Sequence, residues 1–319
     1  MNQGVLTKFK NKVAIIVISN PPVNSLSLKV RNALFDAVDL ADNNSEVSAI
    51  VIKGDGKTFS AGADIKEFAL PLKAPNLPVI CERIENCSKP VVVALHGAAF
   101  GGGLEIALAG HYRVATSGTS VGLPEVHLGL LPGAGGTQRL PRLAGIKVSM
   151  DIIFSGLPLD VAQALKLGII DALVDDLDQN LLQFVSNVIN NGSIVRRTRD
   201  NVEKIQNSTE NKAFILESRN NLLKNSNLPP AYNKILDCIE STMNLSFRDG
   251  LKLENRAFAQ LRNTDESKGM IHAFFAERAS SKIPDIVQAQ PQALKKIGVI
   301  GGGTMGAGIT IAAMQAGFE

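Results

Sequence analysis

Short apolar runs alternate with amphipathic segments in the first third of the chain. Residues 13–19 (VAIIVIS), 47–54 (VSAIVIKG) and 90–97 (PVVVALHG) are rich in β-branched side chains and are predicted to be strands. Between the first two, residues 27–43 place apolar side chains at helical spacing behind Ser27, a suitable N-cap. Strands separated by helices imply crossover connections, so the pattern predicts an α/β fold with a mostly parallel sheet.

The pattern becomes mainly helical in the second half of the chain. Residues 137–175 carry helical periodicity, and residues 178–230, rich in Asn, Ser and Lys, are expected to form helices joined by polar loops. Two amphipathic helices are predicted over residues 247–263 and 265–280. Residues 281–292 (SKIPDIVQAQPQ) are expected to be a connecting segment.

The last segment, residues 295–319, is predicted to be a strand, a glycine turn and an apolar helix. Its glycines Gly301, Gly303 and Gly306 follow the G-x-G-x-x-G spacing, which in this strand–helix context is a dinucleotide-binding fingerprint. The acidic residue that would bind the ribose, about 20 positions further on, would lie beyond Glu319. A lone β-α unit cannot bury its own faces. We therefore expect a truncated NAD-binding domain that does not bind NAD usefully.

Composition and charge narrow the class of protein. With 319 residues, 45% of them hydrophobic, the chain can form one large domain or two ordinary ones. Lys and Arg number 33 against 30 Asp and Glu, and no basic block stands out, so neither nucleic acid nor an anionic membrane is expected as a partner. The cysteines Cys81, Cys87 and Cys238 form no C-x-x-C pair, which favours reduced thiols inside a cell.

The N-terminal segment does not resemble an export signal. Its apolar run of about seven residues is followed by a turn-like NPPVNSL sequence, not by a small-residue cleavage site. No segment reaches the roughly 18–20 apolar residues that a membrane span requires. We therefore expect a soluble intracellular protein.

Two small-residue motifs are candidates for binding an anionic oxygen. Residues 58–68 (TFSAGADIKEF) let a ligand approach the backbone closely, although Gly and Asp are also the usual residues of an ordinary turn. In residues 99–110 (AFGGGLEIALAG), a glycine run opens a predicted helix, whose N-terminal N–H groups favour negative charge. Glu105 stands there among apolar neighbours, so its carboxyl is expected to be partly buried, with a raised pKa suited to acid/base chemistry.

A second isolated carboxylate, Glu125, lies in residues 121–145 (VGLPEVHLGLLPGAGGTQRLPRLAG). Two carboxylates in apolar, glycine-rich settings form a candidate acid/base pair with Glu105. A glycosidase pair would have the same residue types, but the chain has no Trp and only two Tyr for stacking on sugars. The G-x-S-x-G match around Ser120 lacks the helix of a nucleophile elbow. The four histidines show no metal-ligand spacing.

Three motifs, in this order and spacing, resemble the crotonase (enoyl-CoA hydratase/isomerase) superfamily: SAGADIKEF, GAAFGGGLEIALA and LPEVHLGLLPGAGGTQRLPRLAG. The resemblance covers residues 5–185, and residues 247–279 resemble that family's C-terminal helices. Together with the glycine motif that follows, the chain is similar to the N-terminal part of a multifunctional fatty-acid β-oxidation enzyme, in which a hydratase precedes a 3-hydroxyacyl-CoA dehydrogenase.

The resemblance implies a fold and a domain order. The fold is α/β, a crotonase-like spiral of ββα units with C-terminal helices, followed by a truncated Rossmann start. The implied domains are a crotonase core over 1–185, a helical linker with the C-terminal crotonase helices over 186–290, and the first β-α unit of a truncated NAD-binding domain over 295–319.

The resemblance also assigns roles to residues. Ala63 and Gly102 match the positions whose backbone N–H groups form an oxyanion hole, and Glu105 and Glu125 match the two catalytic glutamates. The substrate, a CoA thioester, would lie along residues that match the family's CoA site: Ala61, Ala63, Asp64, Ile65, Lys66 and Gly102.

The implied reaction is the reversible hydration of trans-2-enoyl-CoA to 3-hydroxyacyl-CoA in fatty-acid β-oxidation. Glu105 is assigned to activation of water and Glu125 to protonation of C2, with one proton shared by the pair. Hydration needs no cofactor, and NAD belongs only to the full-length parent protein. Family members that only shift a double bond usually keep one carboxylate, at the position matching Glu125, so the pair favours hydration with isomerisation as a second activity.

Several alternatives stay open from the sequence. The chain could be an isomerase-dominant crotonase, or a crotonase scaffold that only binds, for example RNA, given a pI of about 8.7. The resemblance allows a homotrimer, or a partner thiolase subunit in the full-length protein. It implies the cytoplasm of a bacterium or, alternatively, the peroxisomal matrix.

Overall fold

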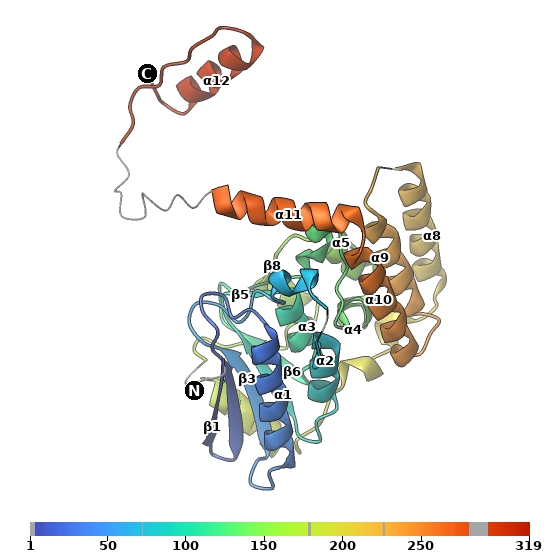
Figure 1. Ribbon diagram of the computed structural model, residues 1–319. Coiled ribbons are helices and arrows are strands. Elements are labelled where there is room, and N and C mark those ends of the chain that lie inside the picture. Colours follow the sequence, from blue (N-terminus) through green and yellow to red (C-terminus); the bar gives the residue numbers. More distant parts are fainter. Residues whose placement is uncertain (1–3, 72, 178–179, 226, 281–292) are drawn as a thin grey trace. The chain divides into compact units, whose positions relative to one another are not determined.

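The computed structural model divides into two compact units, each described here by itself (Figure 1). The larger unit spans residues 1–274 and the smaller spans 275–319. The residues that the structure describes are 4–71, 73–177, 180–225, 227–280 and 293–319.

The centre of the larger unit is a six-stranded sheet with the strand order β1-β2-β3-β4-β6-β9. Its first two strands form an antiparallel hairpin, and every later pair is parallel. A smaller three-stranded sheet has the order β5-β7-β8. The strands are β1 (Val5–Lys10), β2 (Val13–Ile18), β3 (Ala49–Gly54), β4 (Val91–Leu95), β5 (Ala98–Phe100), β6 (Tyr112–Ala115), β7 (Ser120–Gly122), β8 (Leu159–Asp160) and β9 (Ala172–Leu173).

Helices connect the strands in the first part of the chain. After the last strand, α8, α9 and α10 lie side by side in the larger unit (Figure 1). The helices are α1 (Leu28–Asn43), α2 (Leu77–Glu85), α3 (Gly102–Ala109), α4 (Gly136–Ala144), α5 (Ile146–Ser155), α6 (Val161–Lys166), α7 (Asn180–Asn190), α8 (Thr209–Lys224), α9 (Pro230–Ser241), α10 (Phe247–Arg262), α11 (Asp265–Ser280) and α12 (Thr304–Gln315). Short 3₁₀ helices are η1 (Ile65–Ala69), η2 (Pro124–Leu128), η3 (Thr198–Asp200) and η4 (Glu203–Ile205).

Both faces of the main sheet are covered, as a parallel sheet requires. Alternate residues of a strand point to opposite faces, so Ile50 and Ile52 of β3 join the core beneath α1 and α2. Val51 between them joins a second cluster, which α7 covers with Leu181 and Val185. The two-sided burial explains why β4 is apolar throughout and why β3 is apolar over residues 49–52.

Helix α3 lies entirely inside the unit. All eight of its residues are buried, including the Glu105 carboxylate. A helix that is apolar all round is an interior helix. Glu105, the one ionisable residue of α3, therefore belongs to a helix that is buried on all sides.

A buried ion pair joins α2 to α4. Arg139 is 1% exposed, and its Nη2 lies 2.8 Å from Oε2 of the fully buried Glu85. The other Glu85 oxygen accepts from the Arg199 N–H at 2.9 Å, and Arg139 Nη1 donates to the Ala134 carbonyl at 3.0 Å. The pair is thus held by further hydrogen bonds, as a buried ion pair must be to offset the loss of solvation.

Most of the strands and helices expected in the larger unit are confirmed, with small shifts of their ends, but residues 137–175, expected to be helical, also contain the short strands β8 and β9, which pair with the two sheets. The predicted strands appear as β2, β3 and β4, and the helix expected behind Ser27 is α1. Ser27 does occupy the N-cap position, but its side chain makes no capping hydrogen bond. The connecting segment expected over residues 281–292 lies outside the described residues.

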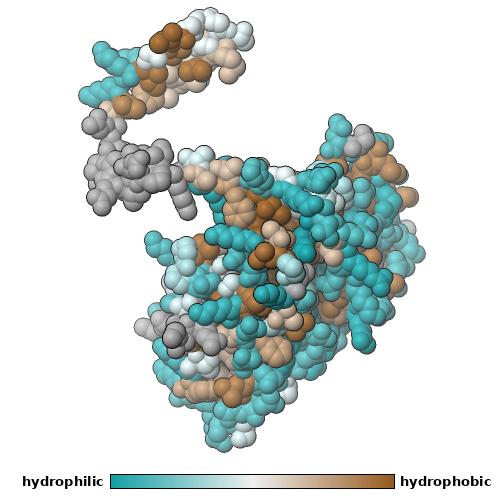
Figure 2. Space-filling view, in the orientation of Figure 1, coloured by the Kyte–Doolittle hydropathy of each residue, from teal (hydrophilic) through white to brown (hydrophobic). Residues whose placement is uncertain are grey.

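The smaller unit differs from expectation at its start. Residues 293–302, all of them described, form no strand, whereas a strand was predicted before the glycine turn. A strand needs a series of hydrogen bonds to an adjacent strand. Here the Ile297 N–H donates to the Glu319 carbonyl and the Glu319 N–H donates to the Lys295 carbonyl, and these two bonds do not make a strand pair. The helix that follows is α12, and none of its residues is buried; Figure 2 shows its brown apolar side chains at the surface. The expectation that this unit cannot bury its own faces is confirmed.

Two further observations bear on organisation. In the described part of the chain, none of the helices combines the length and the apolar character needed to cross a membrane. Residue 185, the expected end of the first domain, falls inside α7 (Asn180–Asn190).

The buried ion pair generates a prediction about stability. Glu85→Ala leaves the Arg139 guanidinium buried without its partner, so we expect the free energy of unfolding to fall by about 3–5 kcal/mol. Urea unfolding followed by circular dichroism measures it. As a control, Lys268→Ala removes one side of an exposed pair, and we expect its unfolding midpoint to match the wild type. Equal midpoints for both variants would contradict the prediction.

Candidate active site

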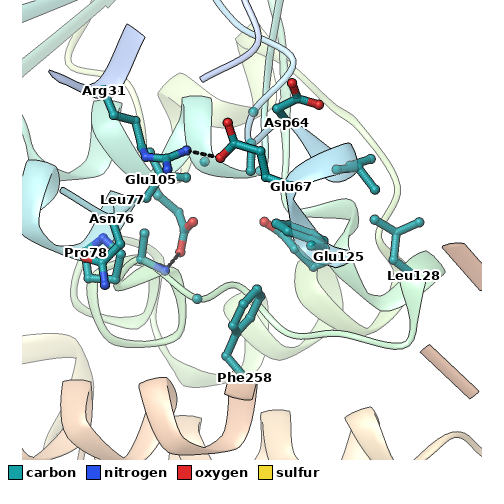
Figure 3. A pocket seen from close by; sticks show the side chains of 18 of the residues that line it. Arg31, Asp64, Glu67, Asn76, Leu77, Pro78, Glu105, Glu125, Leu128 and Phe258 are labelled. Carbon is teal, nitrogen blue, oxygen red and sulfur yellow. Dashed lines mark hydrogen bonds and ion pairs between the residues drawn. The ribbon is translucent and has the colours of Figure 1, made fainter. Parts of the chain in front are cut away.

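A cavity of about 360 Å³ opens in the larger unit between α3, η1, η2 and α10. Figure 3 shows its wall: the carboxyls of Glu105 and Glu125 face a common space from opposite sides, and Phe258 stands below them. Most of the remaining wall is apolar or backbone. Two carboxyls therefore share a small space with little water around it.

The glycines beside this space bring two backbone N–H groups together. Strand β5 ends at Phe100, and Gly101 then turns the chain with φ of +52°, so that α3 begins at Gly102. Gly62 allows its own loop to approach this turn: a Cβ there would lie 2.7 Å from the Phe100 carbonyl oxygen. As a result, the Ala63 nitrogen lies 3.4 Å from the position that a Cβ on Gly102 would occupy.

Both of these N–H groups are available to a ligand. Within the described ranges, neither the Ala63 N–H nor the Gly102 N–H donates a hydrogen bond to another group of the chain. Both residues line the cavity. The Gly102 N–H also belongs to the first turn of α3, where the helix dipole favours negative charge. Two unpaired backbone donors therefore lie close together at the cavity wall.

Glu105 is buried and held by two amides. Its Oε1 accepts from the Ala134 N–H at 2.6 Å and from the Gly136 N–H at 2.9 Å. Burial raises the pKa of Glu105 from 4.5 to about 7, although these two hydrogen bonds and the charge of Arg139 lower it. Near neutral pH this carboxyl can therefore both accept and release a proton. The sequence likewise predicts a raised pKa for Glu105.

Glu125 reaches the same space from η2 and lacks comparable support. Its Oε2 is buried and, within the described part of the chain, has no hydrogen-bond partner. Burial and then the nearby Glu105 charge raise the pKa of Glu125 well above its ordinary value, with a smaller contribution from Glu254. Compared with an exposed carboxyl, Glu125 is therefore shifted toward its protonated form.

The segment expected to hold CoA lies only in part at the cavity. Ala61, Ala63, Asp64 and Ile65 are cavity-wall residues, together with Gly102. Lys66, in the same segment, is exposed on η1, and its backbone N–H donates to the Asp64 side chain. The smaller unit contains Gly301, Gly303 and Gly306. There Gly301 has a φ of +101°, and a Cβ on Gly306 would overlap the Gly301 carbonyl oxygen.

Other candidates from the sequence are not assembled into sites. Ser120 lies on strand β7, not at a strand-to-helix elbow, and its Oγ contacts the Leu159 carbonyl at 3.5 Å. Over the described residues, no group of three or more His, Cys, Asp or Glu side chains could hold a metal ion.

Sequence analysis missed the contribution of α10. Phe258 packs on Gly133 and edge-on against Phe68, with ring centroids 5.8 Å apart, and Asn255 and Ala259 also line the cavity. The same helix carries Glu254, which is fully buried and whose pKa is raised to about 8 by burial and by the Glu105 charge. The available signal was weaker than that at Glu105: Glu254 lies at helical spacing between the apolar residues Leu251 and Phe258, but most of its neighbours in the sequence are polar.

A cluster at the rim also escaped notice. Arg31 Nη1 lies 2.8 Å from Glu67 Oε2, and the Arg31 Nε donates to the Pro75 carbonyl. The other Glu67 oxygen accepts from the Leu28 N–H at 2.7 Å, at the start of α1. This cluster holds η1 against α1, so that the loop with Ala63 is fixed on both sides.

The sequence matches the enoyl-CoA hydratase/isomerase family over residues 8–226. Similar proteins include the peroxisomal fatty acid beta-oxidation multifunctional protein AIM1 of Arabidopsis thaliana, 38% identical over 94% of this chain and 43% of that protein. The peroxisomal bifunctional enzyme of Homo sapiens is 37% identical over 97% of this chain and 44% of that protein. The chain thus spans a little under half the length of these relatives.

Solved structures show the same fold. An enoyl-CoA hydratase from Thermoplasma volcanium GSS1 is 26% identical with a TM-score of 0.57, and it covers 86% of this chain and 98% of its own. A carnitinyl-CoA hydratase from Mycobacterium avium is 25% identical with a TM-score of 0.65, covering 87% of this chain and 97% of its own. The fold expected from the sequence is confirmed.

The raised pKa of Glu105 generates a prediction about stability and pH. Between pH 4.5 and about 7 the folded state keeps a proton on Glu105 that the unfolded state has lost. Stability of the wild type must therefore fall as pH rises through this range. We expect Glu105→Gln to gain on the order of 2 kcal/mol relative to wild type between pH 5 and pH 8, measured by urea unfolding.

The control for this measurement is Glu266→Gln, which changes an exposed carboxylate on α11 in the same way. Its difference from wild type should be independent of pH over this interval. A Glu105→Gln difference that also stays constant would show that Glu105 has an ordinary pKa in the folded chain.

Proposed function

This chain belongs to the enoyl-CoA hydratase/isomerase family, and on that premise we propose that its cavity catalyses the reversible hydration of trans-2-enoyl-CoA to 3-hydroxyacyl-CoA. One observation carries the proposal: two buried carboxyls with raised pKa values face one cavity, beside two free backbone N–H groups. Hydration needs both a proton acceptor and a proton donor at the same double bond, and this pair can supply them.

The two N–H groups stabilise the charge that develops in the reaction. When water adds to C3, electron density moves through C2 onto the thioester oxygen. The Ala63 and Gly102 N–H groups are placed to donate to that oxygen, and preorganised donors of this kind are each worth on the order of 3 kcal/mol. Backbone donors suit the site because a side chain at Gly102 would fill the space between them.

The surroundings of the glutamates support a division of roles. Glu105 accepts two amide hydrogen bonds that stabilise its ionised form, so it serves as the base that takes a proton from water. Glu125 has no such support at Oε2 and its pKa is raised, so it serves as the acid that protonates C2.

Protons balance over the cycle. Water loses one proton to Glu105 while its oxygen bonds to C3, and Glu125 gives one proton to C2. The site then holds protonated Glu105 and ionised Glu125. Transfer of one proton between the two carboxyls restores the starting state, and the reverse sequence dehydrates the 3-hydroxyacyl thioester.

Isomerisation of the double bond is the second candidate activity. It requires one carboxyl that moves a proton between carbons, and the buried Oε2 of Glu125 is the oxygen left free for that transfer. Glu105 would be dispensable for that activity, which separates it from hydration.

The wider setting is also a proposal. Two of the relatives are named as peroxisomal or glyoxysomal fatty acid β-oxidation proteins and a third as a peroxisomal bifunctional enzyme, which supports a role in β-oxidation and the peroxisomal matrix rather than a bacterial cytoplasm. Acyl-CoA is the proposed substrate, and hydration is proposed to need no cofactor. NAD and a dehydrogenase activity would belong to a longer protein, as would a thiolase partner, and a homotrimer stays a proposal.

The carboxyl pair is tested by two substitutions. We expect Glu105→Gln and Glu125→Gln each to lower kcat for hydration of crotonyl-CoA by 10²- to 10⁴-fold, because each removes one proton-transfer group. Loss of absorbance of the enoyl thioester measures the rate, and circular dichroism checks the fold. If either variant kept a near wild-type rate, the two-carboxylate mechanism would be wrong.

The same variants separate the alternatives when a 3-enoyl-CoA is offered. Retained double-bond shifting in Glu105→Gln together with lost hydration would assign isomerisation to Glu125. A wild-type chain without either activity, but with RNA affinity that persists in moderate salt, would favour a binding scaffold.

The oxyanion site is tested by Gly102→Ala. The added Cβ would lie 2.6 Å from Leu77 Cδ1 and 3.4 Å from the Ala63 nitrogen, between the two donors. We expect kcat to fall by about 10²-fold, while the flexible Leu77 side chain lets the fold accommodate the methyl group. Gly269→Ala in α11 is the matched control, because a Cβ there meets no atom within 4 Å and should leave the rate unchanged.

A further inference from the structure

Four consecutive amides of one turn are divided between two buried carboxylates. Glu105 accepts from the Ala134 and Gly136 N–H groups. Glu254 accepts from the two that alternate with them: the Gly135 N–H at 2.6 Å and the Thr137 N–H at 3.0 Å. One carboxylate comes from α3 and the other from α10, 149 residues apart in sequence.

The four N–H groups need acceptors from elsewhere in the chain because the turn forms the start of α4. The first N–H groups of a helix have no partner inside the helix, and in a buried turn each unpaired one costs about 1–3 kcal/mol. Gly135 has a φ of +99°, and a Cβ on it would overlap the Arg139 guanidinium, so the turn depends on glycine at this position. Neither carboxylate takes all four N–H groups, and each one takes the two that the other leaves.

Glu254 is itself held firmly behind the cavity wall. It is fully buried, and its Oε2 accepts from the Thr137 hydroxyl at 2.5 Å as well as from the Thr137 N–H. Residue 255, next to it on α10, is a wall residue, as is Ala134 of the turn. Glu254 thus contacts the turn from the side opposite the cavity.

We propose that Glu254 is a positioning residue for the hydration: by holding the Gly135 and Thr137 amides, it aims the amides of Ala134 and Gly136 at Glu105. The inference rests on the proposed function. Glu254 touches no reacting atom in this scheme and acts on Glu105 through the backbone of the turn. If the turn shifts, Glu105 loses two hydrogen bonds that favour its ionised form and fix its orientation.

Other ionisable groups interact with Glu105 or Glu254 and therefore affect the titration of these two carboxyls. They are Glu125 of η2, Arg139 of α4, Cys81 of α2 and Cys238 of α9. Glu85 of α2 in turn acts on Cys81 and Arg139. Arg139 lowers the pKa of Glu105, whereas Glu105 raises the pKa of Glu254. A substitution that keeps a carboxyl group at position 254 therefore isolates the geometric effect.

The test is Glu254→Asp, which keeps the carboxylate but shortens its reach by one methylene. We expect kcat for crotonyl-CoA hydration to fall by about tenfold with KM changed by less than about threefold, because substrate contacts are untouched. The acidic limb of the kcat/KM profile should move to higher pH by about half a unit, since Glu105 loses hydrogen bonds to its ionised form. Glu266→Asp, at an exposed position, is the matched control.

A second pair of variants covers the case in which Glu254→Asp does not fold. Thr137→Val removes the hydroxyl that donates to Glu254, and Thr137→Ser keeps it. We expect the acidic limb to move upward in Thr137→Val and to match the wild type in Thr137→Ser.

The outcomes are separable. Loss of kcat with an unmoved acidic limb in the folded variant, or an unmoved limb in both Thr137 variants, would overturn the positioning role and leave the hydratase proposal intact. A wild-type chain that does not hydrate crotonyl-CoA would overturn the proposed function itself, and the positioning role with it.

Discussion

The active-site side of this fold depends on how one short turn satisfies its amides. The turn from Ala134 to Thr137 carries four N–H groups into the buried interior, where each of them is paired with a carboxylate. Two carboxylates from helices far apart in sequence take them alternately. The arrangement requires α3 and α10 to approach the turn from two sides, and the cavity is the space left between these parts.

The Ala134 carbonyl of the same turn also has a hydrogen-bond partner. Arg139 reaches back to the Ala134 carbonyl and forms its ion pair with Glu85, at the end of α2. A guanidinium with five donors can serve a carbonyl and a carboxylate together, which an ammonium group could not do in this geometry. The pair therefore connects the turn to the helix that precedes β4. With the turn held on both sides, its amides keep the Glu105 carboxyl in one orientation, which acid/base catalysis requires.

The sequence predicted this architecture best where the signal was local. The β-branched runs that became β2, β3 and β4, and the apolar spacing of α1, record burial on one or two faces, which a short window reveals. Glu105 and Glu125 were found because a carboxylate in an apolar stretch is unusual. Glu254 has mostly polar neighbours in the sequence (KLENRAF, residues 252–258), and its partners are the amides of residues 135 and 137, over a hundred positions away. Contacts of that range depend on tertiary packing, which periodicity does not encode.

The failure at the C-terminal end has the same origin. Residues 295–300 have a strand-like composition, but a strand exists only beside another strand, and here single hydrogen bonds to Glu319 take the place of a ladder. The glycines of the fingerprint still form a tight turn, with Gly301 at positive φ and no room for a side chain on Gly306. Local turn chemistry is therefore retained where long-range pairing is not.

The two glutamates of the cavity differ because of the donors around them, not because of burial. Both lie in the same poorly solvated space, and burial is the largest cause of the raised pKa for each. Two amides and Arg139 act against that rise at Glu105, whereas at Glu125 the negative charge of Glu105 adds to it. Two identical side chains thus differ in their surroundings: the ionised form of Glu105 is stabilised by two amides and Arg139, whereas the ionised form of Glu125 is disfavoured by the neighbouring Glu105 charge. A site that must take a proton from water and give another to carbon needs this asymmetry, and here it arises from the backbone of a single turn.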